Sequence, residues 1–135
     1  MKLIDTHCHL DFDDFDNDRP DVVKQACLAN VKIIIVPGVK AESWEKLIAV
    51  SDQHNLCYAL GLHPYFINEH SVTDLTLLED SLSKFNPVAV GEIGLDYYHG
   101  NGDKRSQLHY FQSQLDIAQS HSLPVIVHAR KSHDD

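Results

Sequence analysis

Short, continuous apolar segments alternate along this chain with segments whose apolar residues recur every three or four positions. The first kind is typical of strands covered on both faces, and the second is typical of amphipathic helices. Five strands are predicted, with starts near residues 3, 32, 56, 88 and 124. Because helical segments separate the strands, the pattern predicts βαβ units and one parallel sheet.

Four helices are predicted between the strands. Trp44, Leu47 and Ile48 are spaced i, i+3, i+4 and indicate a helix over about residues 41–53. A shorter helix is expected to begin near Pro20, a residue that is tolerated in a first helical turn. The apolar positions that predict the other two helices are Leu75, Leu78 and Leu82, and Leu108, Phe111, Leu115 and Ala118.

The composition is that of one globular domain covering residues 1–135. The chain is 43% hydrophobic and 23% charged, which is ordinary for a folded soluble domain. Lys2 and Asp5 interrupt the apolar run that a signal peptide needs, and no segment approaches the roughly 20 apolar residues of a membrane helix. We therefore expect a cytoplasmic protein that has no membrane partner.

The cysteines and the net charge restrict the partners further. Cys8, Cys27 and Cys57 show no zinc-type clustering and cannot all pair, so we expect reduced thiols and no disulfide-linked partner. The formal net charge of -9 argues against a broad basic surface for nucleic acid. It leaves room for a small site at which bound metal ions supply the positive charge.

Side chains that can bind metals follow four of the five predicted strands. They are His7 and His9 after the first strand, His63 after the third, Glu92 at the end of the fourth and His128 at the end of the fifth. The carboxyl ends of parallel strands share one face of a (β/α)8 barrel, and they also line the crevice of an open doubly wound sheet. The pattern therefore predicts one shared site and leaves both folds open.

The interpretation of His7 and His9 depends on the other polar groups at the strand ends. If the first strand runs from Leu3 to His7 and is buried, alternation places Asp5, His7 and His9 on one side. Two imidazoles could then reach one divalent metal ion, and Asp5 could orient a ring from behind. An isolated His-X-His pair would be two surface residues, and the other strand-end groups favour the metal site instead.

Glu92 and His63 each allow more than one interpretation. A lone carboxylate here would cap a turn or pair with an arginine, but beside several histidines Glu92 is expected to bridge two metal ions. Gly91 and Gly94 flank it and permit close approach of backbone or ligand. His63 either faces a substrate or stabilises its own loop. The histidines interpreted as surface residues are His54, His70, His99, His109, His121 and His133.

Four stretches of the chain resemble, in order, the motifs of a known family. They are residues 3–11 (LIDTHCHLD), 61–64 (GLHP), 91–97 (GEIGLDY) and 123–130 (LPVIVHAR). The family is that of the TatD-related metal-dependent hydrolases, within the amidohydrolase-like superfamily of TIM barrels. The resemblance spans nearly the whole chain and implies a TIM-barrel-type α/β fold with parallel strands.

The resemblance also implies roles for individual residues. His7 and His9 would bind a first metal ion, His128 would bind a second, and Glu92 would bridge both ions in the catalytic centre. The cofactors would be two divalent cations, with magnesium, manganese and zinc as candidates. DNA would be the substrate, hydrolysed at its phosphodiester bonds through a metal-activated water.

Two more residues are implied as contacts for substrate phosphate. His63 would lie near the phosphate, and Arg130 would bind it because a planar guanidinium matches phosphate oxygens. The same ligand set serves related binuclear hydrolases of small phosphoesters or cyclic amides, so that alternative stays open.

The chain departs from the family in length. A family barrel has eight strands and roughly 250 residues, whereas about five βα units are predicted in these 135 residues. We therefore expect a truncated N-terminal part of one domain, without the histidine ligand after strand six and the aspartate ligand after strand eight. Apolar edges would be exposed at the first and fifth strands. Such a form would have little nuclease activity alone, and a non-catalytic fragment or scaffold is the other alternative.

Overall fold

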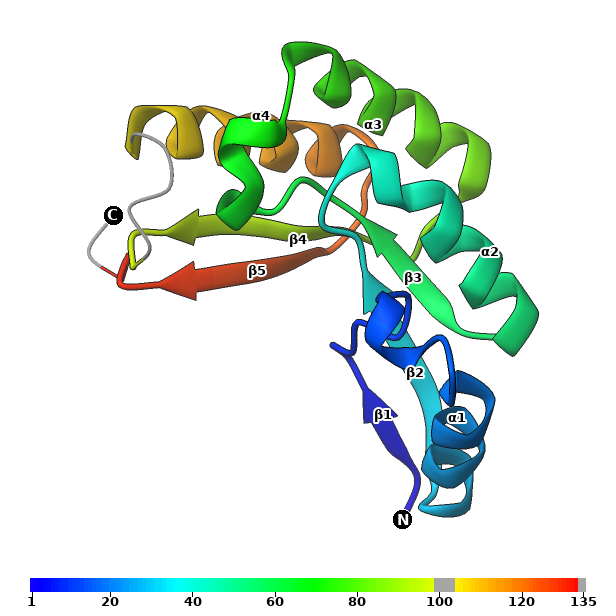
Figure 1. The fold of residues 1–135 in the computed structure, drawn as a ribbon. Coiled ribbons are helices and arrows are strands. Elements are labelled where there is room, and N and C mark those ends of the chain that lie inside the picture. Colours follow the sequence, from blue (N-terminus) through cyan, green and yellow to red (C-terminus); the bar gives the residue numbers. More distant parts are fainter. Residues whose placement is uncertain (99–103, 134–135) are drawn as a thin grey trace.

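The computed structural model of the protein describes residues 1–98 and 104–133. Strands and helices alternate in chain order (Figure 1), and all five predicted strands and four predicted helices are confirmed. The strands are β1 (Leu3–Asp5), β2 (Val31–Pro37), β3 (Cys57–Leu60), β4 (Ala89–Asp96) and β5 (Val125–Arg130). The α-helices are α1 (Arg19–Leu28), α2 (Trp44–His54), α3 (Val72–Phe85) and α4 (Lys104–Ser120). Three 3-10 helices are η1 (Asp13–Phe15), η2 (Ala41–Ser43) and η3 (Pro64–Glu69).

The five strands form one sheet in the order β1-β2-β3-β4-β5, and every neighbouring pair is parallel. The sheet is strongly curved, and the four α-helices cover its outer side (Figure 1). This is a partial TIM barrel, as the predicted fold class requires. The carboxyl ends of all five strands therefore point towards one end of the sheet.

The apolar core lies between the sheet and the helices. Val36, Leu60 and Ile93 of the strands are buried in one cluster with Leu47 of α2 and Leu78 of α3. Side chains on a strand alternate between its two faces, so the residues next to these core positions face the concave side of the sheet. That concave side carries the polar residues described below.

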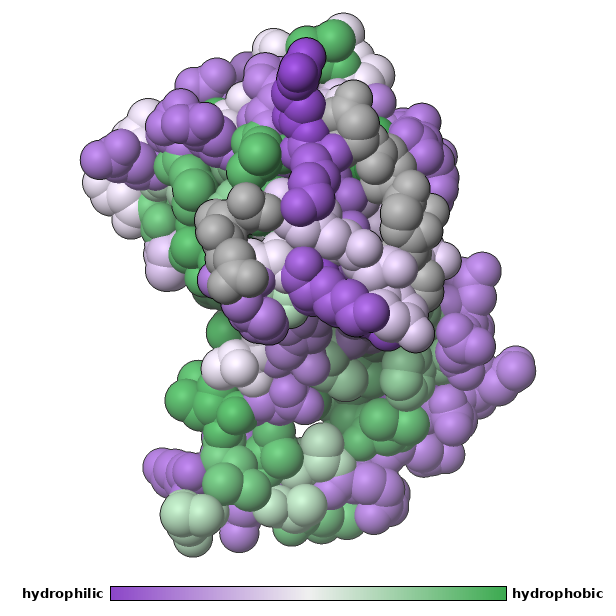
Figure 2. Space-filling model, turned by 90° about the vertical axis from the view of Figure 1, so that its left-hand side faces the viewer, coloured by the Kyte–Doolittle hydropathy of each residue, from purple (hydrophilic) through white to green (hydrophobic). Residues whose placement is uncertain are grey.

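The first strand differs from its prediction. β1 ends at Asp5 instead of His7, and Ile4 is 58% exposed, so the expectation of a buried strand was wrong. Within the described residues β1 pairs only with β2, which leaves its other side uncovered. Figure 2 shows hydrophobic side chains gathered over the lower part of one face, where Figure 1 places β1 and β2. Val127 of β5 is also largely exposed, so apolar edges occur at both strands, as predicted.

Two further differences affect the site. β4 does not end at Glu92 but continues to Asp96, and all eight of its residues are buried. Helix α4 buries Gln107 and Gln114 together with Ala118, while Leu108 is largely exposed. Both differences arise because polar groups are buried here with hydrogen-bond partners, which a count of apolar residues does not detect.

No helix in the described part of the chain is both long and apolar enough to cross a membrane. His99, interpreted from the sequence as a surface residue, lies outside the described residues.

Candidate metal centre

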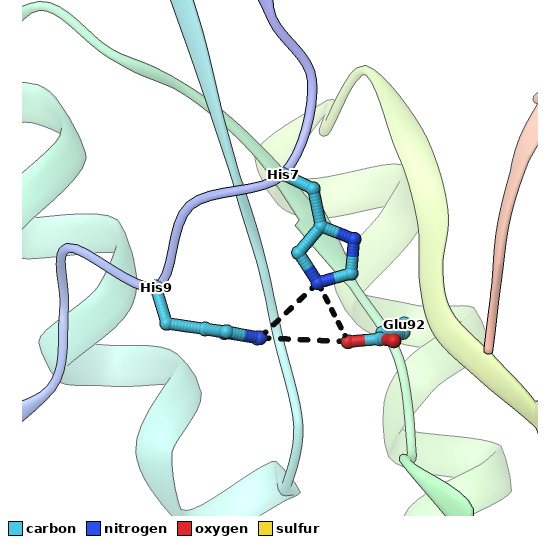
Figure 3. A group of neighbouring side chains, drawn as sticks. All are labelled: His7, His9 and Glu92. Atoms are coloured by element: carbon cyan, nitrogen blue, oxygen red, sulfur yellow. Dashed lines mark hydrogen bonds and ion pairs between the residues drawn. The ribbon is translucent and has the colours of Figure 1, made fainter. Parts of the chain in front are cut away.

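His7, His9 and Glu92 meet at the carboxyl ends of the strands (Figure 3). Nε2 of His7 lies 3.0 Å from Oε2 of Glu92, and Nε2 of His9 lies 3.5 Å from the same oxygen. The two Nε2 atoms are 3.3 Å apart. Three atoms that can donate a lone pair therefore point towards one small volume.

The spacing of these atoms fits a bound cation. Zinc bonds of about 2.0–2.1 Å in a tetrahedral arrangement would place neighbouring ligand atoms about 3.3 Å apart. Oε2 of Glu92 is buried and makes no well-formed hydrogen bond among the described residues, although two imidazoles surround it. Burying an unsatisfied carboxylate oxygen is costly, and a cation between the three atoms would remove that cost.

The second oxygen of Glu92 faces a different pair of histidines. Oε1 lies 3.1 Å from Nδ1 of His128 and 3.5 Å from Nε2 of His63. The rings of these two histidines have centroids 4.3 Å apart. The ligand atoms of these three residues lie within 4.8 Å of one another, so Glu92 and His128 can hold a second metal ion beside His63. Glu92 thus lies between two imidazole pairs, an arrangement suited to a carboxylate that bridges two cations.

An interruption of the β4–β5 ladder positions Glu92. The register shifts between Val90 and Ile93, so both of these residues belong to the apolar core. Within the interruption, the Glu92 N–H donates to the carbonyl of Gly38 at 2.8 Å, and the Gly38 N–H donates to the carbonyl of Gly91 at 3.0 Å. The end of β2 therefore fixes the backbone of Glu92, and bulges of this kind redirect side chains near functional sites.

Gly94 brings β4 and β5 close together beside this interruption. It pairs with His128 in the ladder and has a φ of +142°, and a Cβ there would lie 2.0 Å from the His128 carbonyl oxygen. Only glycine adopts this conformation without strain. The close approach that the sequence suggested around Glu92 is therefore present at Gly94.

The electrostatics of the centre favour an ionised Glu92. Burial of Glu92 opposes ionisation, but its interactions with the imidazoles of His128, His63 and His9 outweigh burial and hold the Glu92 pKa well below its usual range. The hydrogen bond with Glu92 raises the pKa of His128, against the opposing effect of burial, and Asp96 adds to the increase.

His63 stabilises its own loop, one of the two roles that the sequence left open, and also faces Glu92. Its Nδ1 accepts the Tyr65 N–H at 3.0 Å and so stabilises the start of η3, while its Nε2 faces Glu92. A neutral imidazole has one protonated nitrogen, so this acceptor role places the His63 proton on Nε2. His63 is therefore arranged to donate a hydrogen bond from Nε2.

Asp5 differs from its predicted role, and Arg130 contacts an aromatic ring. Asp5 does not contact a ring: its Oδ1 accepts the backbone N–H of His7 at 3.0 Å and so shapes the turn after β1. The guanidinium of Arg130 lies 3.9 Å from the centroid of the Tyr98 ring. Arg130 follows His128 by two residues on β5, so both side chains leave the same face of the strand.

Several polar residues of the centre were not singled out from the sequence. Oδ2 of Asp96 lies 3.0 Å from Nε2 of His128. Gln114 clamps both backbone groups of Leu62 with hydrogen bonds of 2.7 and 3.1 Å, just before His63. A sequence signal for Asp96 was its spacing of four residues from Glu92, which places both on one face of a continued strand.

Three of the histidines interpreted as surface residues are partly buried: His54, His70 and His121. Nε2 of His70 lies 2.9 Å from the carbonyl oxygen of His63, and burial lowers the pKa of His70. His70 therefore supports the loop that carries His63, and its classification as a surface residue was wrong.

Comparisons with known proteins place the chain among metal-dependent hydrolases and nucleases. A family model described as TatD related DNase matches residues 4–135. The uncharacterized metal-dependent hydrolase YjjV of Escherichia coli K12 is 39% identical over 136 residues, which are 98% of this chain and 52% of that protein. The crystal structure of YjjV, described as a TatD homolog, superimposes with a TM-score of 0.89 at 40% identity, over 98% of this chain and 52% of the other.

Two further relatives have names that state an activity. The human protein named deoxyribonuclease TATDN3 is 33% identical over 146 residues, covering 98% of this chain and 53% of that protein. The Erwinia amylovora protein named 3'-5' ssDNA/RNA exonuclease TatD is 31% identical over 134 residues, covering 98% and 52%. The chain thus spans about half the length of the curated relatives it matches.

Proposed function

Since this chain belongs to the TatD-related DNase family, we propose that it provides part of a metal-dependent hydrolase that cleaves phosphodiester bonds in DNA. One observation carries the proposal: the two carboxylate oxygens of Glu92 each face a different pair of histidines. The names of the human and Erwinia relatives support a nucleic acid as the substrate.

We further propose that residues 1–135 are the N-terminal part of a (β/α)8 hydrolase domain. This view is supported by the half-length match to the relatives and by the uncovered concave side of the sheet. Additional metal ligands would then come from the rest of such a domain.

The proposed ligands fall into two sets joined by one carboxylate. His7 and His9 would hold one divalent cation and His128 the other, with Glu92 between them. Magnesium, manganese and zinc are the candidate ions, and the imidazole nitrogens favour the last two over magnesium. When bound, such ions activate a water molecule and stabilise the attacking and leaving oxygens of a phosphodiester.

His63 would act on the substrate and not as a metal ligand. Because its Nδ1 accepts the Tyr65 N–H, the proton on Nε2 occupies the position that a metal ion would need. The same proton suits a phosphate oxygen, which only accepts hydrogen bonds. Arg130 would hold a second phosphate oxygen, and its place over the Tyr98 ring limits the motion of its guanidinium.

A cavity beside the metal centre supports a substrate larger than a phosphate. It has a volume of about 300 Å³ and is lined in part by Phe12, Phe66 and Lys40. Phe12 stacks on the ring of His9 with centroids 4.7 Å apart, so the cavity adjoins the ligands directly. Aromatic side chains of this kind can stack on the bases of single-stranded nucleic acid, whereas the charges of Lys40 and Lys46 in the lining are offset by Asp11, Asp13 and Asp14.

The test is a nuclease assay of the protein expressed from its complete open reading frame. We expect cleavage of labelled single-stranded DNA that requires a divalent cation, stops in a chelator, and falls at least about 100-fold in Glu92→Gln. Glu45→Gln, at an exposed position of α2, is the matched control and should retain full activity. Cleavage that persists in Glu92→Gln, or no cleavage with any of the three cations, would contradict the proposal.

The polypeptide of residues 1–135 alone provides a second comparison. We expect it to bind zinc through Glu92 and the histidines but to turn over little or no DNA. Turnover by this polypeptide that His7→Ala abolishes would show that the described residues suffice for catalysis.

A further inference from the structure

A buried aspartate contacts the side of His128 that faces away from Glu92. Nδ1 of His128 lies 3.1 Å from Glu92 Oε1, and Nε2 lies 3.0 Å from Asp96 Oδ2. We propose that Asp96 is a positioning residue: when a metal ion binds at Nδ1, Asp96 accepts the remaining ring proton on Nε2 and so holds the imidazole with its Nδ1, beside Glu92, facing the ion. This inference rests on the metal binding of the proposed function.

The register of the sheet explains the arrangement. Gly94 pairs with His128, and Glu92 and Asp96 stand two residues before and after Gly94 on the same strand. Alternation places the three residues of β4 on one face. The imidazole of His128 therefore spans the distance between two carboxylates, across a position that has no side chain.

The chemistry of imidazole makes this choice of nitrogen consequential. A neutral ring has one protonated nitrogen, and only the other can bind a cation. Ionised Glu92 and Asp96 can both only accept, so each can take a proton from the His128 ring. Once a cation occupies the Nδ1 side, the remaining ring proton lies on Nε2, where Asp96 accepts it. A histidine ligand that donates its second N–H to a carboxylate is held in orientation and is a more basic ligand.

Asp96 is itself held firmly. Its Oδ1 accepts the Tyr98 N–H at 3.0 Å. Gln107 of α4 accepts the Asp96 N–H at 2.8 Å and donates to the Asp96 carbonyl at 2.9 Å. Asp96 is only 2% exposed, so these contacts are shielded from water. Helix α4 thus fixes the carboxylate that fixes the imidazole.

A purely structural role for Asp96 is the competing explanation, because Oδ1 also stabilises the turn at Tyr98. The two roles differ in what they predict for the His128 ring. If the role is purely structural, substitution of Asp96 changes the free energy of unfolding alone. A positioning role changes which nitrogen of His128 carries the proton, and also changes the affinity for a cation.

The experiment measures both quantities in the ¹⁵N-labelled chain. Long-range ¹H–¹⁵N spectra locate the His128 proton, and calorimetric titration with zinc alone gives the affinity. In the unaltered chain, we expect the ring proton on Nε2 when zinc is bound. In Asp96→Ala we expect the neutral, metal-free ring to carry its proton on Nδ1, beside Glu92, and a zinc affinity lower by about 10- to 100-fold.

Two further variants complete the test. Asp96→Asn keeps the shape and one accepting oxygen, so we expect a loss of affinity between those of the unaltered chain and Asp96→Ala. Asp116→Asn, at an exposed position of α4, is the matched control and should bind zinc as the unaltered chain does. If Asp96→Ala does not fold, Asp96→Asn and the proton position in the unaltered chain decide the question.

The outcomes separate this inference from the proposed function. Zinc binding that is unaffected in both Asp96 variants, or a His128 proton on Nδ1 in the zinc-bound chain, would overturn the positioning role alone. Failure of the unaltered chain to bind zinc would overturn both the inference and the proposed metal centre.

Discussion

The two sides of the candidate metal centre are built differently. Glu92 comes from an eight-residue strand that is buried along its whole length, and its side chain is only 4% exposed. His7 follows a three-residue edge strand, and its side chain is 40% exposed. The first side is held by the pairing of β4 with β5 and by helix α4, and the second by one short pairing with β2.

This difference suggests that the β4–β5 side and the β1 side contribute to cation binding in different ways. The β4–β5 side places its groups before any cation binds, because backbone pairing and buried hydrogen bonds hold them. The β1 side can adjust, since little apolar surface is buried there. Changes on the first side should therefore affect folding, and changes on the second should affect binding alone.

The largest effect is expected from Gly94→Ala on the β4–β5 side. The added Cβ would lie 2.0 Å from the carbonyl oxygen of His128, and the φ of +142° is unfavourable for alanine. We expect a loss of about 4 kcal/mol or more in the free energy of unfolding, measured by urea denaturation. Ser83→Ala, at an exposed position of α3, should change it by less than about 0.5 kcal/mol. A loss below about 1 kcal/mol in Gly94→Ala would show that the paired strands β4 and β5 can accommodate the added Cβ.

A smaller loss is expected from Gln114→Leu, which removes both hydrogen bonds to the Leu62 backbone. The N–H and carbonyl of Leu62 would then be buried without these partners, at a cost of about 2–3 kcal/mol in the free energy of unfolding. Gln112→Leu on the exposed side of the same helix is the matched control. Equal unfolding curves for the two variants would show that the two hydrogen bonds between Gln114 and Leu62 do not stabilise the fold.

On the β1 side, His7→Ala should separate binding from folding. We expect zinc affinity, measured by calorimetry, to fall at least about tenfold because one ligand is lost. The free energy of unfolding should stay within about 0.5 kcal/mol, since the side chain is largely exposed. His109→Ala, at an exposed position of α4, should alter neither quantity. A clear loss of stability in His7→Ala would remove the distinction between the two sides.

The smallest effect is expected from pH on the metal-free chain. The hydrogen bond with Glu92 raises the His128 pKa above its ordinary value of about 6.5. The resulting stabilisation is complete below that ordinary value and is lost as the pH rises through the raised pKa. Urea denaturation in a chelator should therefore show a decrease in stability above neutral pH that His128→Asn removes. Zinc affinity should rise over the same range, because the cation displaces the Nδ1 proton.

The chain order of strands and helices was determined by the sequence alone. Apolar periodicity is local, so the βα repetition could be read before any contact was known. The convergence of His7, His9, Glu92 and His128 also followed, because the carboxyl ends of parallel strands meet in any such fold.

Only the tertiary structure decided how these groups face one another. The ladder interruption at Glu92 sends its two oxygens to different histidine pairs, and the continuation of β4 brings Asp96 to His128. Gln107 and Gln114 look like surface residues of an amphipathic helix, yet each is buried against a backbone amide. Hydrophobic periodicity cannot reveal such residues, because their burial depends on partners that come from distant parts of the chain.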